Sequence, residues 1–145
     1  MHVRWEALSI LAFVVLGVLA TAAASADDWP SLRPGLWEFT RTIQSSRAPG
    51  KPRVVKSTRC VDPVADMKQQ NARLTKAGCR FSAMVRRGNT YAMSSQCKMA
   101  GMDVRSKTVI TVESPAAYRL HVDTMEDGVP GKEDMTARRV GDCKK

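Results

Sequence analysis

From residue 36 onward, hydrophobic and polar positions alternate in short runs, which is typical of half-buried β-strands. In the run LWEFTRTIQ (residues 36–44), Trp37, Phe39 and Ile43 fall on one side, and only an arginine interrupts that apolar face. The run RVVKSTRC (residues 53–60) predicts a second strand. Ser, Gly and Pro residues between the two runs predict a turn or loop.

The next segment, DPVADMKQQNARLTKAG (residues 62–78), breaks the two-residue rhythm and predicts a helix. Asp62 suits the N-cap, Pro63 suits the first helical position, and Gly78 suits the left-handed residue beyond the end. One face is an apolar stripe with a single polar interruption, formed by Val64, Met67, Asn71 and Leu74. We expect this helix to lie over one face or opening of a sheet.

The alternation returns in CRFSAMVRRGNTYAMSSQC (residues 79–97), which is nearly symmetrical about Gly88. A three-residue loop at 87–89 would pair Arg86 with Thr90, and therefore also the cysteines at the two ends of the segment. In that register the apolar faces coincide, with the pairs Val85–Tyr91, Ala83–Met93 and Phe81–Ser95.

Three further alternating runs, at residues 103–113, 118–125 and 133–140, complete the pattern. The predicted fold is α+β and mainly β: an antiparallel meander of about seven strands, curved or closed as a small barrel, with one helix. The inward positions of the last three strands are Val104, Ile110, Val112, Tyr118, Leu120, Val122, Met135 and Ala137.

The first 26 residues differ in character from the rest. They contain a long apolar run and end in Ala-Ser-Ala, which predicts a cleaved secretory signal peptide, with a retained anchor as the alternative. The remaining part, about 119 residues, is the size of one domain. We therefore divide the chain into a signal peptide (1–26), a flexible lead-in (27–36), a single β-rich domain (37–143) and a basic tail (144–145).

All four cysteines, Cys60, Cys79, Cys97 and Cys143, follow the predicted signal peptide. In an exported chain an even number of cysteines predicts two disulfides, and the spacings fit no zinc motif. Four cysteines allow three connectivities. The hairpin register favours Cys79 with Cys97, which leaves Cys60 with Cys143.

The formal net charge is +9 at pH 7, which favours contact with anionic surfaces. The basic residues are scattered, so a solvated basic surface is the plainer interpretation. Nucleic-acid binding is not expected, because exposed aromatic stacking residues are lacking and the chain is predicted to leave the cytosol. No second apolar stretch approaches the length of a transmembrane helix.

Candidate chemistry is sparse, and no enzyme activity or cofactor is predicted. The one histidine after the signal peptide, His121, falls on the presumed solvent face beside Arg119 and Asp123. Oxidised cysteines would offer no nucleophile. The alternative to a binding role is an enzyme of unknown class, or a Cu(I) site through the thioethers of Met99 and Met102.

Four motifs together resemble the bacterial domain-of-unknown-function family 3617. They are PGLWEFT (34–40), Cys60 followed by Pro63, GNTYAMSSQC (88–97) and RRVGDC ending at Cys143. The resemblance implies an exported, periplasmic protein of proteobacterial type with family-wide cysteines, and it implies no activity. Many relatives carry methionine-rich loops after the first strand, where this chain has SSRAPGKPR.

The expected role is that of an uncharacterised, non-catalytic domain of the periplasm. Such a domain would bind an envelope partner protein or a small apolar or anionic ligand. A barrel filled by the predicted core side chains leaves little room for an enclosed ligand. A partner protein is therefore the favoured version.

Overall fold

The computed structural model describes residues 27–144. The predicted signal peptide and the last residue of the predicted basic tail lie outside the described residues. The described residues form eight strands and one helix: β1 (Gly35–Ser45), β2 (Ala48–Val61), α1 (Pro63–Lys76), β3 (Cys79–Phe81), β4 (Val85–Arg87), β5 (Thr90–Met99), β6 (Met102–Ser114), β7 (Ala117–Glu126) and β8 (Val129–Gly141).

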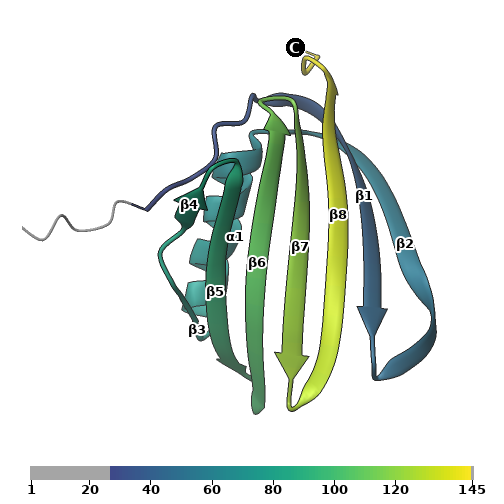
Figure 1. Cartoon of the computed structure of the whole chain (residues 1–145), viewed down its shortest axis with the longest axis vertical. Coiled ribbons are helices and arrows are strands. Elements are labelled where there is room, and N and C mark those ends of the chain that lie inside the picture. Colours follow the sequence, from purple (N-terminus) through teal and green to yellow (C-terminus); the bar gives the residue numbers. More distant parts are fainter. Residues whose placement is uncertain (1–26, 145) are drawn as a thin grey trace, which may run out of the picture.

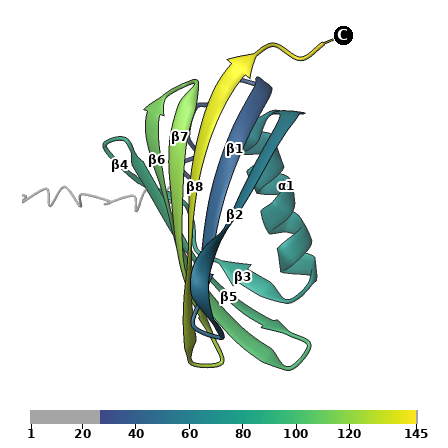
Figure 2. The same cartoon turned by 90° about the vertical axis from the view of Figure 1, so that its right-hand side faces the viewer.

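All strands belong to one antiparallel sheet with the order β2-β1-β8-β7-β6-β5-β3, and β4 also pairs with β5 (Figure 1). The sheet is strongly curved and does not close, so β2 forms one edge and β3 with β4 forms the other (Figure 2). The predicted mainly β fold with one helix is confirmed, in its curved and open form. Pairing of the first strand with the last was not part of the prediction.

Helix α1 joins the two edges of the sheet, because it connects β2 directly to β3. Its 14 residues reach about 21 Å, whereas six strand spacings of a flat sheet span about 29 Å. The curvature shortens this span, and α1 lies on the concave side (Figure 2). Among residues 27–144, no helix has the length and hydrophobicity that crossing a membrane would require.

The residues predicted to begin and end the helix take these roles in the structure. The Asp62 carboxylate accepts hydrogen bonds from the amides of Val64 and Ala65, both at 3.1 Å. Pro63 occupies the first turn, where its missing N–H costs nothing. Gly78 has a φ of 109°, and a Cβ at this position would lie 2.6 Å from the carbonyl oxygen of Lys98. Only glycine fits here without strain.

The hairpin of residues 79–97 contains a bulge that the sequence did not reveal. At its base Cys79 pairs with Cys97 and Phe81 with Ser95, as predicted. Near its tip, however, Val85 pairs with Ala92 instead of Tyr91. One extra residue lies in the first strand between these two registers, and it divides the predicted strand into β3 and β4.

This bulge corrects the predicted facing of two side chains. Because side chains alternate between the faces of a strand, a shift of one residue exchanges inward and outward positions. Met84, predicted to face outward, is 1% exposed and belongs to the core. Val85, predicted to face inward, is 49% exposed. The loop is also one residue shorter than predicted, with Gly88 at φ 62° in its first position, as a two-residue hairpin turn requires.

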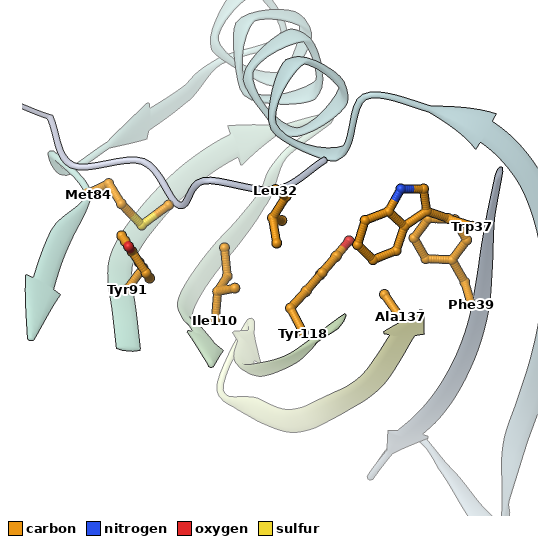
Figure 3. Close-up of a cluster of buried hydrophobic side chains, with 8 residues drawn as sticks. All are labelled: Leu32, Trp37, Phe39, Met84, Tyr91, Ile110, Tyr118 and Ala137. Carbon is orange, nitrogen blue, oxygen red and sulfur yellow. The ribbon is translucent and has the colours of Figure 1, made fainter. Parts of the chain in front are cut away.

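The core lies between the concave face of the sheet, the lead-in and α1 (Figure 3). Trp37 and Ile110 are fully buried, and the rings of Trp37 and Tyr118 are 5.6 Å apart. Most of these side chains come from positions that the alternation had predicted to face inward. The core consists of Leu32, Trp37, Phe39, Met84, Tyr91, Ile110, Tyr118 and Ala137.

The segment before β1 is packed against the sheet, although the sequence analysis treated it as a flexible lead-in outside the domain. Leu32 is part of the core, and Pro30 is buried. The amide of Asp28 donates to the carbonyl of Met84 at 3.0 Å, and the amide of Arg33 donates to the carbonyl of Pro115 at 2.9 Å. An irregular segment with prolines gave no periodic signal from which this packing could be predicted.

Candidate functional site

The four cysteines form two sulfur pairs with the partners that the sequence analysis favoured. The Sγ atoms of Cys79 and Cys97 are 2.04 Å apart, and those of Cys60 and Cys143 are 2.12 Å apart. The first pair is buried inside the β3–β5 ladder. The second connects edge strand β2 to the residues after β8, across β1. All four sulfurs are therefore structural, and none is a free thiol.

His121 lies on the convex face of β7, on the side that strand parity predicted. Its Nδ1 is 2.6 Å from a carboxylate oxygen of Asp134, and its Nε2 is 3.1 Å from one of Asp123. Both hydrogen bonds raise the pKa of His121 above its usual value, and the bond with Asp134 has the larger effect. Both ring nitrogens are therefore held by carboxylates, an arrangement that favours the protonated imidazole.

Tyr118 is the second titratable group with an altered pKa. Burial raises the pKa of its phenol to about 12, so the side chain stays neutral at physiological pH. It packs against Trp37 in the core, where it contributes apolar area.

The structure brings the two candidate copper-binding methionines together at one turn. Met99 and Met102 are paired in the β5–β6 register, on either side of Ala100 and Gly101. Both turn residues have positive φ, 49° and 80°, as a tight hairpin requires. Among residues 27–144, no group of three or more His, Cys, Asp or Glu side chains could hold a metal ion. A Cu(I) site formed by two thioethers stays a prediction.

Edge strand β2 is long and open to solvent. It pairs only with β1, and 13 of its 14 residues are exposed. From Arg53 to Val61 the pairing with β1 is continuous, so this part is a regular strand whose outer side faces no other strand. Val54 is 56% exposed and Val55 is 38% exposed, one on each face of the strand.

The end of β2 near α1 is anchored by one arginine. Arg59 forms an ion pair with Asp66 of α1, with 2.8 Å between nitrogen and oxygen. Its guanidinium also lies 5.1 Å from the centre of the Phe39 ring. This side chain therefore connects the outermost strand to both the helix and the core, and it holds the edge in place.

The other end of β2 bows away from the sheet. Ala48 pairs with Ser45 and Arg53 with Ile43, so four residues of β2 oppose the single residue Gln44 of β1. We call these four residues, Pro49–Gly50–Lys51–Pro52, the proline bulge. The sequence analysis placed them in a loop, whereas the structure includes them in β2.

A groove of about 810 Å³ lies beside the proline bulge, between the β1–β2 hairpin and the β7–β8 hairpin. Its lining includes three cations, Lys51, Arg53 and Lys132, and one carboxylate, that of Asp123. Ion pairs among residues 27–144 involve other cations, namely Arg41, Arg47, Arg59, Arg105, Arg119, His121 and Arg139. Within residues 27–144 the three cations of the groove thus form no ion pair, although the carboxylate of Asp123 belongs to the same lining.

The sequence analysis named none of these β2 features as a site. Arg53 and Lys51 were counted among scattered basic residues, because a one-dimensional sequence does not show that Lys132, some 80 positions later, lies beside them. The open edge was equally hidden, because strand order depends on long-range pairing. The one available signal was the PGKP sequence, since proline and glycine often mark irregular strand pairing.

Comparison with known proteins agrees with the resemblance seen in the sequence motifs. Residues 32–143 match the family model described as a protein of unknown function, DUF3617. No curated protein and no solved structure matches the chain. The matched range contains every strand, the helix and all four cysteines. The chain therefore belongs to the DUF3617 family.

Proposed function

We propose that this chain is an exported, periplasmic, non-catalytic domain that binds an extended acidic segment of an envelope partner protein along the outer edge of β2. The single observation that carries this proposal is the regular, uncovered edge from Arg53 to Val61. The partner segment adds as a further strand next to β2, a common mode of peptide recognition.

Backbone hydrogen bonding provides the main attraction at such an edge. An edge strand leaves every second residue's N–H and C=O directed away from the sheet, where only water or another strand satisfies them. Val54 and Val55 add apolar contact on the two faces of the strand. Together these features fit an extended polypeptide better than a compact small molecule.

Charge selects the class of partner. β2 carries four cations, Lys51, Arg53, Lys56 and Arg59, and no acidic residue. Only Arg59 has a carboxylate partner, on α1. A partner rich in Asp and Glu would place opposite charges next to Arg53 and Lys56, which favours both association rate and register.

Proteins often use lysine, proline and bulges to prevent another strand from pairing with a sheet edge, and β2 contains all three features. Lys51 and both prolines lie in the proline bulge, so the protection is confined to residues 49–52. Residues 53–61 contain no proline, no bulge and a single lysine, Lys56. This part of the edge therefore remains open to strand addition.

Three features support the other parts of the proposal. The sequence of residues 1–26 has the pattern of a signal peptide, and two disulfides are compatible with an oxidising compartment. The thiols are bonded, and His121 is held by two carboxylates, which supports binding rather than catalysis.

Site-specific photocrosslinking in intact cells tests the proposal. A photoreactive residue is placed in turn at each position from Val54 to Thr58, and crosslinked peptides are identified by mass spectrometry. Strand addition predicts crosslinks to one continuous acidic segment. As the photoreactive label moves along β2, the crosslinked position should move along that segment, in the opposite direction for an antiparallel partner strand and in the same direction for a parallel one. Lys56→Glu should weaken the crosslinks formed by labels at the other positions, because it places a negative charge next to the acidic segment.

The matched control is Arg80→Glu, which changes an exposed cation on edge strand β3 at the opposite side of the sheet. It should leave the crosslinks unchanged. Crosslinks scattered over many unrelated proteins, or equal losses in both variants, would contradict the proposed function.

A further inference from the structure

We infer that the groove beside the proline bulge is a second binding site, for a phosphate group, and that it acts independently of the partner-binding edge. The groove lies between two hairpins, and its lining combines residues of β2, β1, β7 and β8. The edge proposed above is the outer side of residues 53–61. The two sites meet at Arg53, whereas Lys51, Asp123 and Lys132 of the groove lie outside residues 53–61.

The charge of the groove favours a dianion. Lys51, Arg53 and Lys132 contribute three positive charges, and Asp123 contributes one negative charge, which leaves a net charge of +2. All three cations are exposed, and a groove lined by charges of one sign raises the local concentration of counter-ions, so anions gather there. A phosphate ester or free phosphate has the size and charge that such a cluster accepts, and arginine matches its oxygens in a bidentate manner.

The backbone of the proline bulge adds hydrogen-bond donors. Prolines have no N–H, so Gly50 and Lys51 carry the only amides of the four-residue bulge. Neither residue has a partner in the β1–β2 register, because the register passes from Ala48 directly to Arg53. These two amides thus lie outside the ladder and next to the cationic side chains of the groove.

Part of the remaining lining is apolar, which allows part of a larger molecule to accompany the phosphate. Ile43, Pro49, Pro52 and Pro130 line the same groove. The phosphate group could thus be free or belong to an anionic lipid headgroup at a membrane surface. Both sources share the recognition chemistry, and the experiment separates them.

Binding is measured on the purified, oxidised chain with three probes. Inorganic phosphate and pyrophosphate are titrated by calorimetry and by amide chemical shifts, and vesicles of phosphatidylglycerol are compared with vesicles of phosphatidylcholine by flotation. The double variant Lys51→Gln/Lys132→Gln removes two cations of the groove. The matched control Arg80→Gln/Lys98→Gln removes two exposed cations of β3 and β5, and so lowers the net charge equally.

We expect phosphate or pyrophosphate to shift the amides of Gly50, Lys51 and Lys132. The groove variant should bind at least about tenfold more weakly, while the control variant keeps its affinity within about twofold. Binding of phosphatidylglycerol vesicles alone, lost in the groove variant and kept in the control, would support the site and identify the lipid as the source of the phosphate.

Two results would overturn the inference. One is that neither the soluble anions nor the anionic vesicles bind. The other is that both variants weaken binding equally, which would show attraction to total charge rather than to the groove. Crosslinking at β2 is unaffected by Lys132→Gln in either case, so the partner-binding proposal is judged separately.

Discussion

Removing the bond between Cys60 and Cys143 should reveal how strongly it stabilises the fold. The two cysteines are 83 residues apart in sequence, and both are exposed. In the chain-entropy model a closed loop of this length lowers the free energy of folding by about 4.5 kcal/mol. Because the side chains are exposed, their replacement removes little packing. The double variant Cys60→Ala/Cys143→Ala therefore isolates the effect of the cross-link.

This loss is large compared with the total stability of a domain, which is about 5–15 kcal/mol. With a urea dependence of about 2 kcal/mol per molar, the midpoint of unfolding should fall by about 2 M. The slope itself should increase, because an unfolded chain without the cross-link exposes more surface. Equilibrium unfolding monitored by tryptophan fluorescence measures both quantities, since Trp37 lies in the core.

Ser57→Ala, an exposed substitution on the same strand, provides the control and should change stability by no more than about 0.5 kcal/mol. A double variant that loses less than about 1 kcal/mol, with an unchanged slope, would refute the reasoning. It would mean that the bond neither restricts the unfolded chain nor holds β2 against β1.

Two further predictions concern single residues. Asp134→Asn should lower the pKa of His121 toward 6.5, because it removes the hydrogen bond that contributes most to the raised value. NMR titration of the imidazole measures this pKa. An unchanged pKa would show that the Asp134 hydrogen bond is not its main cause. Since the folded-state pKa is raised, the stabilisation by protonated His121 is complete below pH 6.5 and is lost as the pH rises through the folded-state pKa. Gly78→Ala should destabilise the fold by more than about 1 kcal/mol, because of its positive φ and the nearby Lys98 carbonyl; a neutral result in thermal unfolding would show that the α1–β3 junction relaxes freely.

Local features were accessible from the sequence because they depend on neighbouring residues. The capping residues Asp62 and Gly78 delimited α1, since both act within one turn of the helix. Alternation identified inward-facing Trp37, Ile110 and Tyr118, because side chains of a strand alternate regardless of its partner. The pairing of Cys79 with Cys97 followed from the symmetry of a single hairpin.

The register within that hairpin shows where local reasoning ends. A single bulge between Phe81 and Val85 places Met84 in the core, and the sequence pattern around it remains compatible with an unbroken strand. The lead-in packs against this bulge, where the Asp28 amide donates a hydrogen bond to the Met84 carbonyl. Such a contact joins segments more than fifty residues apart.

The candidate sites were decided by tertiary structure alone. The run RVVKSTRC predicts a strand, but only the pairing of β1 with β8 leaves β2 at an open edge. Likewise, Lys51 and Lys132 share a groove because two hairpins lie next to each other in the sheet. The sequence by itself determined the helix, most of the strand residues and most of the core-facing positions, since these follow from local periodicity. Strand order, edges and grooves depend on long-range pairing, whose free energy is spread over many contacts and leaves no local pattern.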